Sequence, residues 1–130
     1  MKIAILIARV LLGLMFFVFG LNGILHFLPM PAMPPSDATT YMTILATHNY
    51  FTFVALLMVI AGLLLLVGRY VPLALVILGP ILVNILLYHV TLLHGGGIGP
   101  GAFGTVLELF LIWAYRFSFR GLFDAAPEVS

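Results

Sequence analysis

Six polar side chains that interrupt long apolar runs are the candidates for chemistry: Glu108, Asn84, His89, Asn22, His26 and Tyr88. Glu108 is the most informative, because an acidic residue at the centre of a membrane helix costs about 2.5–3.5 kcal/mol on insertion scales. Such residues face the bundle interior and commonly transfer protons or anchor ligands. The competing interpretation is a carboxyl group that only joins helices through a hydrogen bond to Asn84 or Asn22.

The histidines are scattered, and their spacing does not predict a metal site. No two of them are three or four residues apart, and His89 and His94 are five apart, so one helix face does not present two ligands. A haem between His26 and His89 has no further sequence feature in its favour. We expect His26, His48 and His94 to lie at helix ends, where an amphipathic ring meets water or headgroups. His89 lies deeper and needs a partner, for which Glu108 is the candidate.

The composition indicates that lipid surrounds most of the chain. Of 130 residues, 64% are hydrophobic and 7% are charged, whereas a soluble domain carries about 25% charged residues. The formal net charge of +1 and the lack of a basic cluster argue against a nucleic-acid partner. The chain has no cysteine, which excludes thiolate metal sites and dithiol redox relays on this chain.

Four apolar stretches, each near the ~20 residues that cross a bilayer, predict a single transmembrane domain over residues 1–130. The expected spans are about 3–28, 50–67, 72–93 and 102–117. The fold class is therefore all-α, an integral membrane four-helix antiparallel bundle. Ser36 and Asp37 follow a proline-rich segment and are typical helix-capping residues, so we expect a short surface helix between spans one and two.

The basic residues predict the orientation of the bundle. With four spans, Lys2, Arg69, Arg116 and Arg120 fall at one end, and the other end has no lysine or arginine. The positive-inside rule then places both termini in the cytoplasm, and we expect a bacterial inner (plasma) membrane location. In this topology Asn22, Asn84, His89 and Glu108 reach similar depths in the outer half, with Tyr88 one turn from Asn84. The sequence thus predicts a polar layer shared by three spans.

Two segments resemble the DoxX family of small membrane proteins. The first span carries the family's Arg-x-Leu-Leu-Gly-Leu-x-Phe-x-x-x-Gly pattern as Arg9, Leu11, Leu12, Gly13, Leu14, Phe16 and Gly20. The stretch "AGLLLLVGRYVPLA" is similar to the turn that leads from the family's second span into its third, and the tail "WAYRFSFRGLF" is familiar from small members. The resemblance implies a four-helix membrane bundle and, by analogy with redox-associated members, a role in a membrane redox system. No catalytic motif of the family maps onto these residues.

The favoured function is an accessory or ligand-binding subunit of a membrane redox system. A quinone- or lipid-like molecule is the expected ligand, whereas haem and metal ions are not expected. Whether the chain is an enzyme stays open, because no self-sufficient catalytic motif is present. The alternative is a non-catalytic membrane scaffold or assembly partner. Besides the lipid bilayer, the candidate partners are an oxidoreductase and further copies of this chain. A transporter is disfavoured, because too few polar residues line any path across the membrane.

Overall fold

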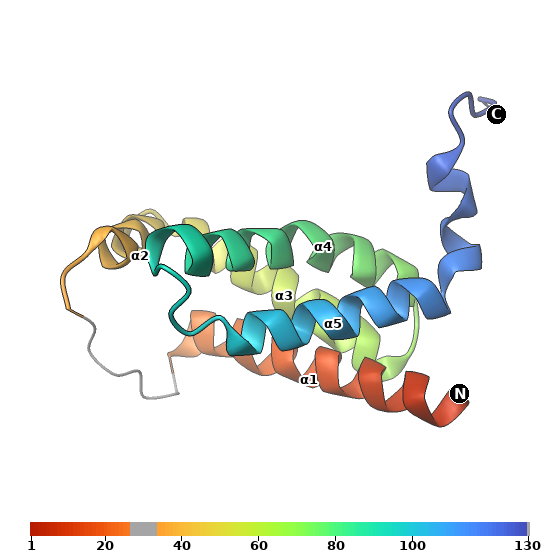
Figure 1. Ribbon diagram of the computed structural model, residues 1–130, viewed down its shortest axis with the longest axis horizontal. Helices are drawn as coiled ribbons and strands as arrows, with labels where there is room; N and C mark the ends of the chain where they lie inside the picture. The colour runs from red at the N-terminus through yellow and green to blue at the C-terminus, as the bar shows by residue number, and fades with distance from the viewer. Residues whose placement is uncertain (27–33, 130) are drawn as a thin grey trace.

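Four long helices lie side by side in the computed structural model, which describes residues 1–26 and 34–129 (Figure 1). They are α1 (Lys2–Leu25), α3 (Tyr50–Val67), α4 (Val71–Leu87) and α5 (Gly99–Ala114). Helix α1 packs against α3 and α5, and α4 packs against the same two helices from the other side. The predicted all-α bundle, with a short helix between the first two spans, is confirmed. Both chain ends lie at one end of the bundle.

The short helix α2 (Asp37–Thr47) begins where the sequence predicts it. Ser36 and Thr39 form a reciprocal capping box, in which the Ser36 N–H donates to Thr39 Oγ1 at 2.8 Å and the Thr39 N–H donates to Ser36 Oγ at 3.3 Å. These bonds satisfy backbone donors that a helix start otherwise leaves unpaired. Helix α2 packs on the start of α3 and on the turn after α4, so it covers the bundle end opposite the termini.

The first three spans differ from their predicted limits only near their ends. Helix α1 ends at Leu25 because His26 takes a left-handed conformation with φ 53°, and predicted span residues 27 and 28 lie outside the described residues. Helix α4 continues as a single π-helical turn, η1 (Tyr88–Leu92). A π turn carries one extra residue per hydrogen-bonded ring, so it rotates the side chains at the end of this span.

The fourth span lies three residues earlier than expected, with the same length, and ends in a sharp bend. Helix α5 begins at Gly99 rather than at residue 102 and ends at Ala114 rather than at residue 117. Its 16 residues extend about 24 Å at the usual rise, less than the ~30 Å hydrocarbon core. After an 82° bend the chain continues as the 3₁₀ helix η2 (Arg116–Phe123). Among the described residues, three helices therefore have full spanning length, and the bent pair is the fourth candidate span.

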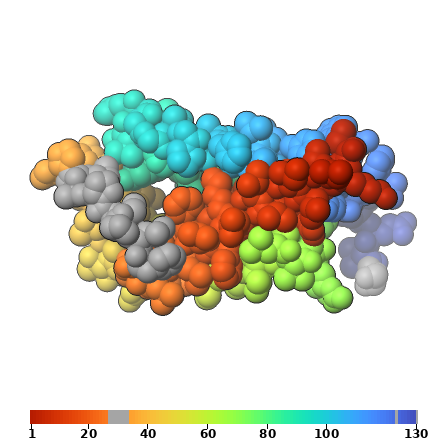
Figure 2. Space-filling model, turned by 90° about the horizontal axis from the view of Figure 1, so that it is seen from below, coloured from red at the N-terminus to blue at the C-terminus, as the bar shows by residue number. Residues whose placement is uncertain are grey.

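Helices α1 and α3 form the closest contact of the bundle. A methyl group added to Gly62 would lie 2.7 Å from the Gly13 carbonyl oxygen, and one added to Gly20 would lie 2.8 Å from the Ala55 oxygen. Small residues permit this backbone approach, which drives helix association in membranes where the hydrophobic effect is weak. The space-filling view shows α1 in contact with its neighbours along its length (Figure 2).

The outer surface of the bundle is as apolar as its interior. Phe53, Val83 and Val106 are about 60% exposed, while Leu12, Leu65, Leu75, Leu78 and Leu111 are fully buried. A protein with so continuous an apolar exterior would aggregate in water. The surface is the one that a hydrocarbon solvent requires.

Candidate functional site

Glu108 is the buried ionisable residue of the bundle, with 4% of its surface exposed. It lies on the face of α5 that also buries Gly101, Gly104 and Leu111. Neither carboxyl oxygen has a hydrogen-bond partner within residues 1–26 and 34–129. An unsatisfied buried polar group costs about 1–3 kcal/mol of folding free energy. The packing of the bundle gives no reason for this destabilising residue.

Gly79 leaves room directly in front of the carboxyl group. A methyl group added to Gly79 of α4 would lie 3.7 Å from Glu108 Oε2, an ordinary contact distance, and would meet nothing else. Gly79 therefore differs from Gly13, Gly20 and Gly62, whose missing side chains are replaced by tightly packed atoms of a neighbouring helix. The site around Glu108 has space on its α4 side.

An apolar groove of about 460 Å³ opens between α1 and α5 on the lipid-facing surface. Leu11, Met15 and Phe19 of α1 line one wall, and Pro100 and Phe103 of α5 line the other. Such a groove matches a hydrocarbon chain or an isoprenoid tail in its chemistry and offers nothing to a polar solute.

Met15 of α1 lines this groove and contacts α5 one helical turn before Glu108. Its terminal methyl group lies 3.0 Å from the position that a side chain on Gly104 would occupy, and Gly104 is one helical turn before Glu108 on the same face. Methionine is unbranched and adapts readily to new packing. Met15 thus connects the groove to the segment of α5 that carries Glu108 one turn later.

His89 does not pair with Glu108, contrary to expectation. Its Nδ1 donates to the Ile85 carbonyl oxygen at 2.7 Å, and its ring edge contacts Tyr88 with centroids 5.2 Å apart. The other ring nitrogen lies toward Gly97, in the loop before α5. The π turn is the physical reason, because it rotates His89 toward this loop.

Tyr88 and His26 also lie away from the carboxyl group. The Tyr88 hydroxyl donates to the Ala38 carbonyl oxygen at 3.5 Å, and its ring packs on Tyr41 with centroids 5.8 Å apart, so it joins the third span to α2. His26 is exposed at the end of α1, where its backbone N–H donates to the Asn22 carbonyl oxygen at 2.8 Å. Tyr88 serves the contact with α2, and His26 ends its helix.

The two asparagines lie on different surfaces. Asn22 is half-buried on α1 and its polar group is engaged within the structure. Asn84 is exposed on the outside of α4. The predicted polar layer is therefore divided: Glu108 is buried within the bundle, Asn84 and His26 are exposed, and Tyr88 and His89 bond to other residues. In the part of the chain that the structure describes, no three histidine or carboxylate side chains gather as a metal site would need.

A second polar group, which the sequence did not predict as a site, lies at the termini end of the bundle. Lys2, Arg9 and Tyr115 line a cavity of about 380 Å³ between α1 and the end of α5. The spacing of Lys2 and Arg9 was a usable signal, because residues seven apart share one helix face. The arrival of Tyr115 beside them depends on tertiary packing.

The helices, their apolar exterior and the buried carboxyl group define a small helical integral membrane protein. Comparisons with protein-family models, with curated proteins and with solved structures each find no match to this chain.

Proposed function

We propose that this chain binds a quinone- or lipid-like molecule within the membrane, as an accessory subunit of a membrane redox system. The observation that carries the proposal is the buried Glu108 carboxyl group, whose two oxygens lack partners among the described residues. Intramembrane ionisable residues are expensive and are usually retained for function. A ligand headgroup that hydrogen-bonds to Glu108 would offset this cost.

The surroundings of Glu108 suit an amphiphilic ligand. The apolar groove would hold a hydrocarbon or isoprenoid tail, and Met15 would shift to admit the headgroup. A carboxyl group donates to a carbonyl oxygen when protonated and accepts from a hydroxyl group when ionised. The carboxyl group therefore fits both the oxidised and the reduced headgroup of a quinone. It could also exchange protons with the headgroup as the quinone changes its redox state.

The redox assignment rests on the DoxX resemblance of the first span and of the α3–α4 turn, together with the absence of cysteine. A chain without thiols needs its ligand or a partner to carry electrons. This part of the proposal is an analogy between folds and motifs. The ligand-binding part stands on Glu108 and the groove.

The test is the small molecule that co-purifies with the protein. We expect a quinone- or lipid-like molecule in about one-to-one ratio with the wild type, and at least about tenfold less with Glu108→Leu, because a hydrogen bond to a buried carboxyl group contributes about 1.5–3 kcal/mol. Leucine is similar in volume and removes both oxygens. Mass spectrometry of the organic extract from gently solubilised protein provides the measurement.

The matched control is Thr105→Val, one turn from Glu108 on α5. It removes a hydroxyl group that donates to the Gly101 carbonyl oxygen at 2.8 Å within its own helix, so the ligand should stay bound. Equal amounts of the same molecule in wild type and Glu108→Leu, at matched stability, would refute the ligand site.

Asn84 favours a second candidate function, a membrane scaffold that assembles with further copies of itself. Asn84 is exposed, about 20 Å along a span of about 33 Å at the usual rise. An amide facing hydrocarbon is costly. A carboxamide both donates and accepts, so it can pair with the same residue of a second copy, and such polar contacts join membrane helices.

Asn84→Leu is therefore expected to weaken self-association about fivefold, since one interhelical hydrogen bond contributes about 1 kcal/mol in membranes. Photobleaching step counts of labelled protein in lipid bilayers measure the fraction of dimers at each density. Val83→Leu, an apolar change at the neighbouring exposed position, serves as the control. A monomeric wild type, or a dimer unaffected by Asn84→Leu, would exclude this role.

A further inference from the structure

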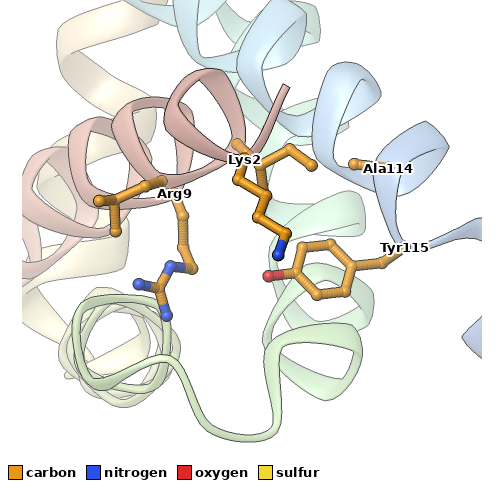
Figure 3. Close-up of a pocket in the computed structure, with 6 residues that line it drawn as sticks. Lys2, Arg9, Ala114 and Tyr115 are labelled. Carbon is orange, nitrogen blue, oxygen red and sulfur yellow. The ribbon is translucent and has the colours of Figure 1, made fainter.

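A cavity lined by three polar and three apolar residues lies at the end of the bundle where both termini are found. It is formed by the first turns of α1 and by the junction between α5 and η2, and its volume is about 380 Å³. In Figure 3 the Lys2 ammonium group lies beside the Tyr115 hydroxyl, and the Arg9 side chain points to the same side of α1. Two cationic groups and one hydroxyl group thus surround one space.

The positive charge of this cavity is uncompensated by the protein. Across residues 1–26 and 34–129, neither Lys2 nor Arg9 forms an ion pair with a carboxylate. None of the chain's acidic residues lines the cavity: Asp37 starts α2 at the opposite end, Glu108 is buried in the bundle, and Asp124 and Glu128 follow η2. The net positive charge of the lining residues attracts an anion.

Arg9 is held in place rather than extended freely into solvent. It is half-buried, and its guanidinium group packs directly on Gly68 in the α3–α4 turn, where any side chain would overlap it. Gly68 has φ 83°, a left-handed conformation that glycine adopts without strain. A planar guanidinium fixed in this way loses little entropy on binding and presents its N–H groups as a fork to tetrahedral oxyanions.

We propose that Lys2, Arg9 and Tyr115 bind a phosphate group, supplied by an anionic lipid headgroup or by a soluble phosphate. Three donors of different kinds approach the cavity from two helices, and a phosphate has enough acceptor oxygens to satisfy all three. This site is independent of Glu108, which lies about two turns further into the bundle along α5.

The test is binding of phosphatidylglycerol to the full chain in a neutral detergent, followed by native mass spectrometry. The wild type should retain one phosphatidylglycerol in preference to phosphatidylcholine, and Arg9→Gln should weaken this binding about tenfold. Arg120→Gln removes the same charge from an exposed residue of η2 at the same end, and it should weaken binding less than about twofold. Equal losses in the two variants would indicate general surface attraction and would overturn the site.

Competition distinguishes the two sources of phosphate. The cavity binds a soluble phosphate if millimolar inorganic phosphate displaces the lipid from the wild type. In that case inorganic phosphate should bind to Arg9→Gln no better than background. Lipid that resists displacement assigns the cavity to a headgroup. A wild type that binds neither probe overturns the proposal.

Tyr115→Phe keeps the test decisive if Arg9→Gln fails to fold. This variant removes one hydroxyl group and no charge, and it should weaken phosphatidylglycerol binding about threefold while leaving thermal stability within error. Unchanged affinity in Tyr115→Phe, together with unchanged affinity in Arg9→Lys, would contradict a phosphate held by these three groups.

Discussion

Gly62→Ala is expected to lower the free energy of unfolding by about 3 kcal/mol, the upper end of the usual cost of overpacking. The added methyl group would lie 2.6 Å from the Phe17 nitrogen and 2.7 Å from the Gly13 carbonyl oxygen. Both are backbone atoms of α1 and cannot turn aside as a side chain would. The two helices must therefore separate, and they lose dispersion contacts along the most extensive pairing of the bundle.

Gly79→Ala provides the matched control for this prediction. It makes the same change inside α4, where the new methyl group meets only Glu108 Oε2 at 3.7 Å. Alanine also favours a helix over glycine by about 1 kcal/mol, so this variant should be as stable as wild type or slightly more stable. Unfolding in mixed micelles, followed by circular dichroism, compares the two. If both variants lose the same stability, tight α1–α3 packing at Gly62 is not the cause.

Glu108→Leu is expected to stabilise the ligand-free protein by about 1–3 kcal/mol, the cost of leaving a buried polar group unsatisfied. Leucine has a similar volume and brings no polar atom into the space between α5 and α4. The same substitution is expected to lower ligand retention at least about tenfold. A variant that folds better and binds worse would separate the role of Glu108 in binding from any role in folding.

The measurement compares unfolding midpoints of wild type, Glu108→Leu and Glu108→Gln after the ligand has been removed with detergent. Glutamine keeps a polar group at the site, so it should leave the stability close to that of wild type. A Leu variant that unfolds more easily than wild type would mean that the carboxyl group is satisfied within the folded chain, and the argument for an absent headgroup would fail.

The helices and their order were predictable from the sequence because their causes are local. Long apolar runs require a lipid solvent, and Pro72 and Gly68 interrupt them where the backbone must turn. Ser36 begins α2 through a bond to a residue three positions away. The burial of Glu108 was predictable as well, because the cost of a carboxyl group in hydrocarbon hardly depends on the details of packing.

The neighbours of Glu108 were decided by the tertiary structure. In a membrane helix the inner and outer faces are both apolar, so hydropathy does not reveal how each helix is rotated about its axis. Depth alone placed Asn84 and His89 beside Glu108, whereas α4 turns Asn84 outward and the π turn directs His89 to a loop. Packing instead brings Gly79 in front of the carboxyl group.

The cavity of Lys2, Arg9 and Tyr115 also has one feature that the sequence predicts and one that depends on tertiary structure. The seven-residue spacing that aligns Lys2 with Arg9 is a property of the sequence. The approach of Tyr115 requires that α5 pack beside α1 and that the chain bend by 82° after Ala114. Sequence alone determined a lipid-embedded helical bundle with one costly acid inside it. Tertiary structure decided which groups meet, because helix rotation and bending depend on contacts between segments far apart in the chain.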